Sequence, residues 1–259
     1  RDVAANDQVV NFRASYDQEM ERLAAYLVDE QGLERIACFY QDDAYGQVGL
    51  SGITKALERR GMSLAATGTY ERNTVAVARG LETVKAGRPQ AVVMVGAYTG
   101  CAAFIKSAKA DPAFDGVRFC NISFVGTKAL GAALGADADG VVVSQCVPFP
   151  WDLSTPAVAE YHAAMAAAGH GEDAIGFVSL EGYLATRGFL RALDALEGDV
   201  TRAGLLQAFA DLGSFDLGGV PHAFGEGDNQ GSDTVHLTVF EGTEIRPLGT
   251  AAIATVPTP

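Results

Sequence analysis

The sequence predicts an α/β protein built on doubly wound parallel sheets, and two observations support this prediction. From residue 34 to residue 147, short β-rich runs alternate with helical stretches in a regular order. Several of these runs, such as AVVMV at 91–95 and GVVVSQCV at 140–147, are almost continuously apolar, as parallel strands covered on both faces should be. This order of strands and helices therefore predicts a layer with helices on both sides of the sheet.

The elements of this layer follow one another along the chain. Strands are expected at 35–40, 63–70, 91–95, 117–121 and 140–147. Helices are expected at 46–60, 74–86, 99–110 and 127–134, where Leu, Ile and Ala recur three and four residues apart. Ahead of them, VVNFRASYDQEMERL predicts a short strand through Phe12 and a helix that begins at Ser15 or Asp17.

The character of the chain changes after Val147. PFPWDLSTP contains three prolines and the only Trp, and helices are expected next at 156–168, 177–196 and 201–212 with no strand between them. From Leu217 onward, Gly-Asp-Asn and Glu-Gly-Thr turns separate alternating runs such as 235–240, which predicts a β-hairpin or meander.

The length of 259 residues favours two domains over one. The regular α/β block accounts for one of them, and the opening residues and later helices are left over. We expect residues 1–16 and 149–216 to form part of lobe 1, most of whose sheet is missing from this chain. Residues 17–148 and 217–259 are expected to form lobe 2.

Composition excludes several classes of function. The formal net charge of −13, with only 19 Lys and Arg, argues against nucleic-acid binding. No apolar run approaches the roughly 18 residues of a membrane helix. The four cysteines form no CxxC motif and have no histidine at metal spacing, so a zinc site is not expected.

Motifs for catalysis and cofactor binding are absent as well. The chain has neither GxGxxG after its first strand nor GxxxxGK[ST], and it lacks the GxSxG nucleophile elbow. Its four histidines are scattered over helix, loop and tail. We therefore expect a protein without enzymatic activity or cofactor.

The loop FYQDDAYGQ, residues 39–47, is the first candidate for a functional site. It follows a predicted strand, and open α/β sheets bind ligands at the carboxyl ends of their strands. Asp42 and Asp43 have no further carboxylate or histidine nearby in the chain, so we expect them to cap the next helix or to complete a turn. Tyr45 offers apolar area and one hydroxyl, either to a ligand or to ordinary packing.

Several segments, in order, carry a resemblance to a known family. They are NFRASYDQE, RIACFYQDDAYGQ, VVMVGAYTGCAAFIKSAK, FVG, GVVVSQCVPFPWD and FVSLEGYLATRGFLRAL. Together they resemble the type I periplasmic solute-binding proteins of ABC importers, in particular the leucine/isoleucine/valine-binding class. The resemblance implies two α/β lobes joined by three crossings, a ligand held in the cleft between them, a membrane permease as partner and a periplasmic location.

The resemblance also implies that this sequence begins just before the first crossing. On the order of a hundred residues of lobe 1 would then be absent, judged by typical domain size. That part would carry the signal peptide and the main contacts to a ligand carboxylate.

Seven residues match positions that face the ligand in this family or lie beside such positions. They are Tyr45, Ala97, Tyr98, Ser123, Phe124, Glu181 and Tyr183. Tyr98 is open to a second interpretation as a rim residue, and Glu181 as a solvated helix residue. Trp151 is interpreted as packing at a crossing, with a ligand platform as the alternative.

Ser123 departs from the family pattern, because amino-acid receptors of this class have an acidic residue there that pairs with the ligand ammonium. A buried ammonium without such a partner is costly. The expected ligand is therefore a branched-chain or other amino acid, or an aromatic or aliphatic carboxylate, with the amine-free carboxylates favoured unless Glu181 or Asp152 supplies the charge.

Two other functions use the same fold. One is the ligand-sensing domain of a signalling receptor, which the sequence does not separate from a transport protein. The other is an enzyme on a flavodoxin-like layer, against which the missing phosphate loops and scattered acid–base residues count.

Overall fold

The computed structural model describes residues 8–249 and 252–253, and this part of the chain divides into two compact units. Unit 1 comprises the described residues up to Ser15 together with Cys146–Thr234. Unit 2 comprises Tyr16–Gln145 together with the described residues from Val235 onward. None of the helices in the described ranges is both long and apolar enough to cross a membrane.

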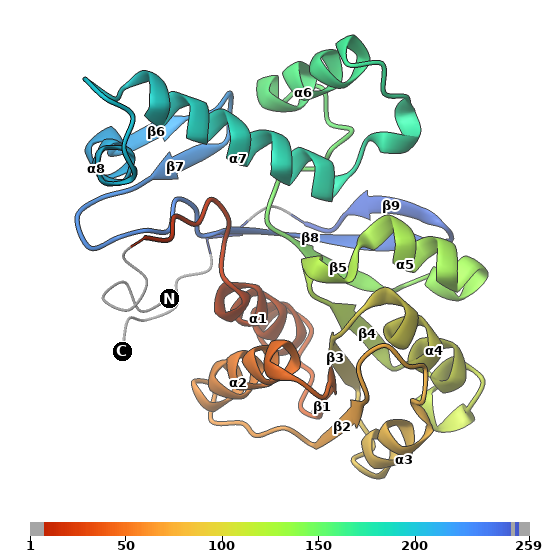
Figure 1. Ribbon diagram of the computed structural model, residues 1–259. Helices are drawn as coiled ribbons and strands as arrows, with labels where there is room; N and C mark the ends of the chain where they lie inside the picture. The colour runs from red at the N-terminus through yellow and green to blue at the C-terminus, as the bar shows by residue number, and fades with distance from the viewer. Residues whose placement is uncertain (1–7, 250–251, 254–259) are drawn as a thin grey trace. The chain divides into compact units, whose positions relative to one another are not determined.

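Unit 2 is a doubly wound layer around one mostly parallel sheet (Figure 1). Its parallel strands stand in the order β2-β1-β3-β4-β5. Their bounds are β1 Ile36–Gln41, β2 Ala66–Tyr70, β3 Ala91–Val95, β4 Arg118–Asn121 and β5 Val142–Gln145. Strand β8 (Thr234–Glu241) runs antiparallel to β5, β9 (Glu244–Pro247) runs antiparallel to β8, and β10 (Ala252–Ile253) also pairs with β8.

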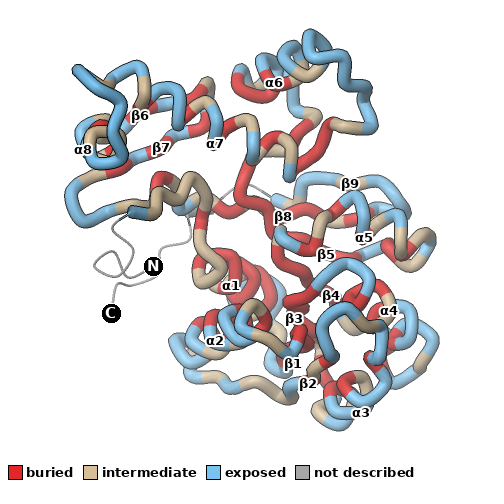
Figure 2. Tube along the Cα trace, in the orientation of Figure 1, coloured by how far each residue is buried: buried red, intermediate tan, exposed pale blue. Residues whose placement is uncertain are grey.

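Helices cover both faces of this sheet because side chains along each strand alternate between two cores. Ile36, Cys38 and Tyr40 face the core formed with α1 (Tyr16–Ala24) and α2 (Ala44–Glu58). Ala37 and Phe39 face the core formed with the helices on the other side. Those helices are α3 (Ala78–Ala86), α4 (Tyr98–Lys109) and α5 (Thr127–Leu134). Figure 2 shows the resulting burial, with β1 and β3 buried along their whole lengths.

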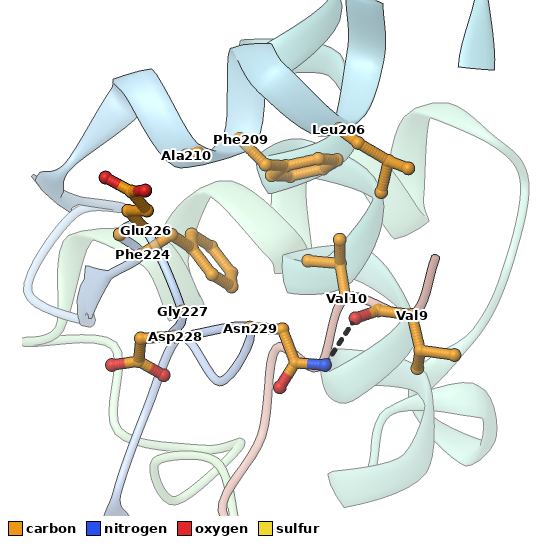
Figure 3. Close-up of a pocket in the computed structure, with 11 residues that line it drawn as sticks. Val9, Val10, Leu206, Phe209, Ala210, Phe224, Glu226, Gly227, Asp228 and Asn229 are labelled. Atoms are coloured by element: carbon orange, nitrogen blue, oxygen red, sulfur yellow. Dashed lines mark hydrogen bonds between the residues drawn. The ribbon is translucent and has the colours of Figure 1, made fainter. Parts of the chain in front are cut away.

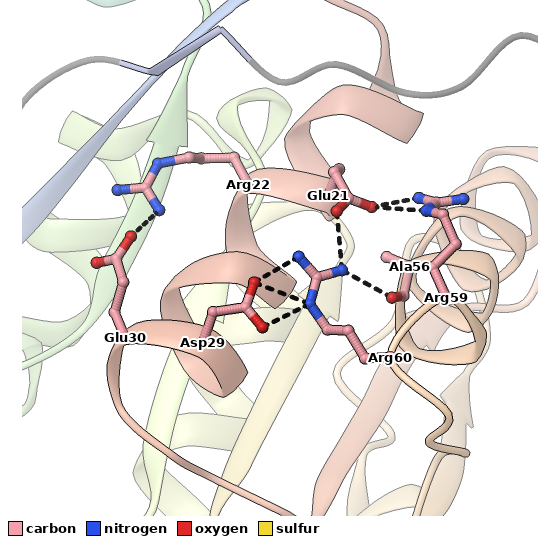
Figure 4. Close-up of polar contacts among 7 residues, drawn as sticks. All are labelled: Glu21, Arg22, Asp29, Glu30, Ala56, Arg59 and Arg60. Carbon is pink, nitrogen blue, oxygen red and sulfur yellow. Dashed lines mark hydrogen bonds and ion pairs between the residues drawn. The ribbon is translucent and has the colours of Figure 1, made fainter.

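A network of ion pairs joins α2 to α1 and to the π-helical turn Ala25–Glu30 that continues α1 (Figure 4). Arg60 pairs with Glu21 at 2.8 Å and with Asp29 at 2.8 Å, and Arg59 also pairs with Glu21. Isolated surface ion pairs contribute little to stability, but two arginines sharing one carboxylate hold the two helices in one relative position.

The described residues of unit 1 form three α-helices, a 3₁₀ turn at Glu172–Ala174 and a short hairpin. The helices are α6 (Pro156–Ala167), α7 (Phe177–Asp194) and α8 (Arg202–Leu212), and the hairpin pairs β6 (Ser214–Asp216) with β7 (Pro221–Ala223). An aromatic cluster packs α8 and the hairpin around Phe12, whose ring lies 5.7 Å from Phe209, 5.7 Å from His222 and 5.3 Å from Phe224. The strand expected through Phe12 is not formed, because Asn11 makes only an isolated bridge with Gln230.

The expected lobe boundaries need three corrections. Tyr16 was assigned to lobe 1 but belongs to unit 2, and residues 146–148 and 217–234 were assigned to lobe 2 but belong to unit 1. The largest of these differences is the segment 217–234. The reason is hydrogen bonding within unit 1: the N–H of Gly231 donates to the carbonyl of Asn11 at 2.7 Å, and the N–H of Ala223 donates to Gly231 at 2.9 Å. The alternating pattern of this segment predicts a hairpin but does not indicate which unit the hairpin joins.

Candidate ligand-binding site

The first loop at the carboxyl edge of the unit 2 sheet is held by a chain of hydrogen bonds. Asp43 accepts from the N–H of Gly46 at 3.1 Å, as a helix cap, and from the side chain of Gln41 at 2.6 Å. The Tyr70 hydroxyl donates to Gln41 at 3.1 Å and accepts from the N–H of Ala97 at 2.9 Å. The loop after β1 is therefore tied to the loop after β3.

The side chain of Asp43 has a structural role in this network, and Asp42 takes part through its backbone N–H, which donates to the carbonyl of Tyr70 at 2.9 Å. Burial works to raise the pKa of Asp43, but hydrogen bonds from Gly46 and Gln41 and the charge of Arg72 lower it overall. Within the described ranges, no three His, Cys, Asp or Glu side chains are grouped to hold a metal ion. Asp43 caps α2, as the sequence predicts.

Tyr45 lies in an aromatic cluster of unit 2. Its ring centroid is 5.7 Å from that of Tyr16 and 5.2 Å from that of Phe124, which itself is 63% exposed. The Tyr45 hydroxyl is buried and has no hydrogen-bond partner in the described part of the chain. Burial raises the pKa of this phenol, so the hydroxyl stays protonated and can donate.

Ala97 and Tyr98 lie at the start of α4, where both are exposed, Tyr98 by 41%. The N–H of Ala97 is already bonded to Tyr70, so it is not available to a ligand in this conformation. Tyr70 fits there because Gly96 and Gly100 carry no side chain: a Cβ on Gly100 would lie 2.4 Å from its ring.

Ser123 begins a 3₁₀ turn, Ser123–Val125, after β4. Its N–H donates to the carboxylate of Glu19 at 2.8 Å and its hydroxyl donates to the same carboxylate at 3.0 Å. The hydroxyl of Ser144, near the end of β5, donates to the Glu19 carboxylate at 2.5 Å. Glu19 was not among the predicted site residues, although it lies four residues before Leu23 and seven before Tyr26, on the buried side of α1.

Asn121, the last residue of β4, was also missed. Its side chain is fully buried, and neither its amide nitrogen nor its amide oxygen has a hydrogen-bond partner among the described residues. It lies in register with Met94 of β3 and Val143 of β5, both apolar. A polar residue at the carboxyl end of an apolar strand is the signal in the sequence that points to it.

The two candidates on α7 belong to unit 1. Glu181 forms an ion pair with Arg13 at 3.4 Å, so its charge is shared with that guanidinium. Tyr183 packs against Tyr161 with centroids 5.6 Å apart, and Arg187 lies 5.8 Å from its ring centroid. Burial raises the pKa of Tyr183.

The Pro-rich segment after Cys146 is ordered by local contacts. Asp152 accepts from both the N–H and the hydroxyl of Ser154, at 3.1 and 2.5 Å, and these hydrogen bonds lower its pKa. Trp151 packs against Phe149 and Phe177, with centroid distances of 5.1 and 5.9 Å. Asp152 therefore orders its own turn.

Unit 1 also contains a cavity of about 240 Å³ that none of the predicted site residues lines (Figure 3). Val9, Val10, Leu206, Phe209 and Phe224 give it apolar walls, and the carboxylates of Glu226 and Asp228 lie at its end. Asn229 closes one side by donating to the carbonyl of Val9 at 2.7 Å.

The sheet order, the helices on both faces and the loops at the carboxyl edge define a type I periplasmic binding protein fold, and comparison with known proteins agrees. Residues 2–244 match a family model described as periplasmic binding protein, so the chain belongs to this family. A comparison with curated proteins gives no significant match.

Among solved structures, one similar protein is a possible leucine/isoleucine/valine-binding protein from Rhodopirellula baltica SH 1. It is 33% identical, with a TM-score of 0.86 over 95% of this chain and 68% of that chain. A branched-chain amino acid ABC transporter protein from Thermus thermophilus with bound valine is 18% identical, with a TM-score of 0.82 over 95% of this chain and 68% of that chain.

A third similar structure is a solute-binding protein of an ABC transporter from R. palustris in complex with benzoate. It is 22% identical, with a TM-score of 0.74 over 93% of this chain and 65% of that chain. At these lower identities the second and third structures show the fold alone. The similar structures are binding proteins rather than enzymes.

Proposed function

We propose that this chain is the substrate-binding component of an ABC importer and that it captures a small amino-acid-like or carboxylate solute in the periplasm. The observation that carries the proposal is the contact between Tyr45 and Phe124 at the carboxyl edge of the unit 2 sheet. Parallel sheets bind ligands at this edge, and an exposed aromatic side chain backed by a second ring is a suitable platform for an apolar part of a solute.

Within this proposal, Tyr45, Phe124, Tyr98 and Ser123 contribute from unit 2, and Tyr183 and Glu181 contribute from unit 1. Ala97 contributes to the shape of the site and donates no hydrogen bond to the solute, because its N–H is bonded to Tyr70. Binding proceeds without chemical change of the solute. Closure of two lobes around the solute, which the family resemblance implies, belongs to the proposal and would lower the radius of gyration measured by solution scattering when ligand is added.

A screen by thermal shift and calorimetry tests the proposal. The solutes are aliphatic amino acids, their deaminated acids and aromatic carboxylates, because a ligand that binds the folded state raises its apparent stability. Tyr45→Ala and Tyr183→Ala should each weaken binding of the best solute by about 1–3 kcal/mol if their rings are buried anchors.

The matched control is Phe189→Ala. Phe189 is also aromatic, its exposed fraction is 43%, and it is not a predicted site residue. It should leave the affinity unchanged. If no solute shifts the melting temperature, or if turnover of a bound solute is observed, the proposal fails. A ligand-sensing domain shares the binding step and is separated from transport by measuring uptake of the solute with the cognate permease.

A further inference from the structure

Helix α7 of unit 1 exposes a row of uncharged residues (Figure 2). Val178 is 71% exposed and Phe189 is 43% exposed. Gly182 lies between them, and a Cβ at this position would meet no atom within 4 Å. Ala185 and Leu193 are partly exposed. Contiguous apolar residues on a protein surface mark interaction sites, so this row indicates a contact surface.

The spacing of the row is that of a seam between two packed helices. Positions 178, 182, 185, 189 and 193 are four, three, four and four residues apart, which keeps them on one side of an α-helix. The buried stripe of α7, with Leu180, Leu184 and Gly188, lies on another side of the helix. Helix α7 is therefore apolar on two sides, and the described part of unit 1 covers only one of them.

The charges of α7 balance one another. The helix has two acidic and two basic residues, none of which belongs to the row: Glu181, Arg187, Arg191 and Asp194. The whole chain has a formal net charge of −13, so two copies repel each other on average. A neutral helix with an uncharged row is where this repulsion is small, and charge therefore favours α7 as the surface where a second copy approaches.

The row is complementary to itself about a two-fold axis that passes between residues 185 and 186. Two α7 helices that pack antiparallel about this axis place Phe189 of one copy opposite Gly182 of the other, and Val178 opposite Leu193. The largest side chain of the row thus faces the position that has no side chain. A two-fold interface makes each contact twice, and seven residues are close to two helical turns, so both Phe–Gly pairs lie on the same side.

We propose that the row Val178, Gly182, Ala185, Phe189 and Leu193 is a docking surface for a second copy of this chain, with the ring of Phe189 filling the space above the partner's Gly182. The inference concerns assembly and does not rest on the proposed function. One helix face is small for a specific interface, so the dimer is weak, with a Kd of about 1–100 μM.

Sedimentation velocity over concentrations that bracket this Kd tests the proposal. Phe189→Ala removes the ring and should raise the Kd at least about tenfold. Gly182→Phe should have the same effect, about tenfold or more, because two rings then compete for one space. The chain with both Gly182→Phe and Phe189→Gly exchanges the two residues, so it should dimerise again with a Kd within about threefold of the wild type.

Leu190→Ala is the matched control. Leu190 is 49% exposed and follows Phe189 directly, but it lies about 100° further around the helix. Its substitution should leave the Kd within about twofold of the wild type. Circular dichroism identifies any single variant that fails to fold, and the decision then rests on the exchange variant, which has the composition of the wild type.

A wild-type chain that stays monomeric throughout would overturn the proposal, and the row would then contact a different occupant, such as the part of lobe 1 that the resemblance implies. Equal weakening by Leu190→Ala, or an exchange variant that does not dimerise, would also overturn it, because the association would then be non-specific. Solute binding by Phe189→Ala should be unchanged, so dimerisation and the proposed function are decided separately.

Discussion

The rings of Tyr45 and Phe124 lie 5.2 Å apart, although the strands that they follow are not neighbours. Tyr45 follows β1 and Phe124 follows β4, and β3 stands between these two strands. The pair therefore spans the carboxyl end of β3. The order of the strands in the sheet brings the two rings together, since the two residues are far apart in the sequence.

The first prediction concerns this pair. Tyr45→Ala and Phe124→Ala should be coupled, with an interaction free energy of about 0.5–1.5 kcal/mol in a double-mutant cycle of unfolding. Urea denaturation of the four proteins measures it. Tyr45→Ala combined with Tyr98→Ala is the comparison, and its effects should add because the described structure has no ring contact between these two residues. Additive effects for Tyr45 and Phe124 would mean that the rings do not interact in solution.

The second prediction concerns Asn121. A buried amide that lacks partners costs about 1–3 kcal/mol, so Asn121→Leu should raise the free energy of unfolding by an amount in that range if the site is dry. Gln41→Leu removes an amide of the same sheet edge that is paired with Asp43 and Tyr70, and it should destabilise the protein instead. Destabilisation by both substitutions would show that water or a solute satisfies Asn121.

The third prediction compares two glycines of α7. A Cβ on Gly188 would lie 1.9 Å from Cε1 of Phe12, whose ring is held by Phe209 and Phe224. Gly188→Ala should therefore destabilise the protein by about 1–3 kcal/mol through overpacking. A Cβ on Gly182 meets nothing within 4 Å, so Gly182→Ala should stabilise by about 0.5–1 kcal/mol through helix propensity.

Thermal or urea unfolding of both variants provides the measurement. Equal effects of the two substitutions would contradict the packing of Phe12 on α7. Gly182→Ala serves as the control for a general effect of alanine in this helix.

The fourth prediction is a dependence of stability on pH. Burial lowers the pKa of His236 in β8 to about 4, from an ordinary value near 6.5. Below pH 6.5 the unfolded chain takes up a proton that the folded chain does not, so the free energy of unfolding should fall between pH 6.5 and pH 4. The contribution is about 2 kcal/mol, allowing for the partial exposure of the ring.

Urea denaturation at pH 7, 5 and 4 measures this loss for the wild type and for His236→Gln. The variant should lose less stability over the interval than the wild type. The exposed His170 supplies the control, because His170→Gln should leave the dependence unchanged. His222, whose pKa is also lowered by burial, contributes in the same direction in all three proteins.

Much of the local structure could be predicted because its causes are local. Strand β3 and helix α5 have the predicted bounds to the residue. The apolar run of β3 reflects burial on both faces, and the spacing in α5 reflects one buried stripe. Helix α3 starts at Ala78 instead of residue 74, because Thr74 turns back to bond the carbonyl of Glu71.

The sequence by itself therefore determined the α/β class, most strands and helices, and the capping role of Asp43. Only the tertiary structure decided that Glu19 binds Ser123, 104 residues away, that Tyr45 contacts Phe124, and that residues 217–234 join unit 1. Hydrophobic periodicity in the sequence indicates which face of a helix or strand is buried, and helix capping involves residues only three or four positions apart. Which distant side chain meets that face depends on strand order and register, and these are set by the packing of the whole unit.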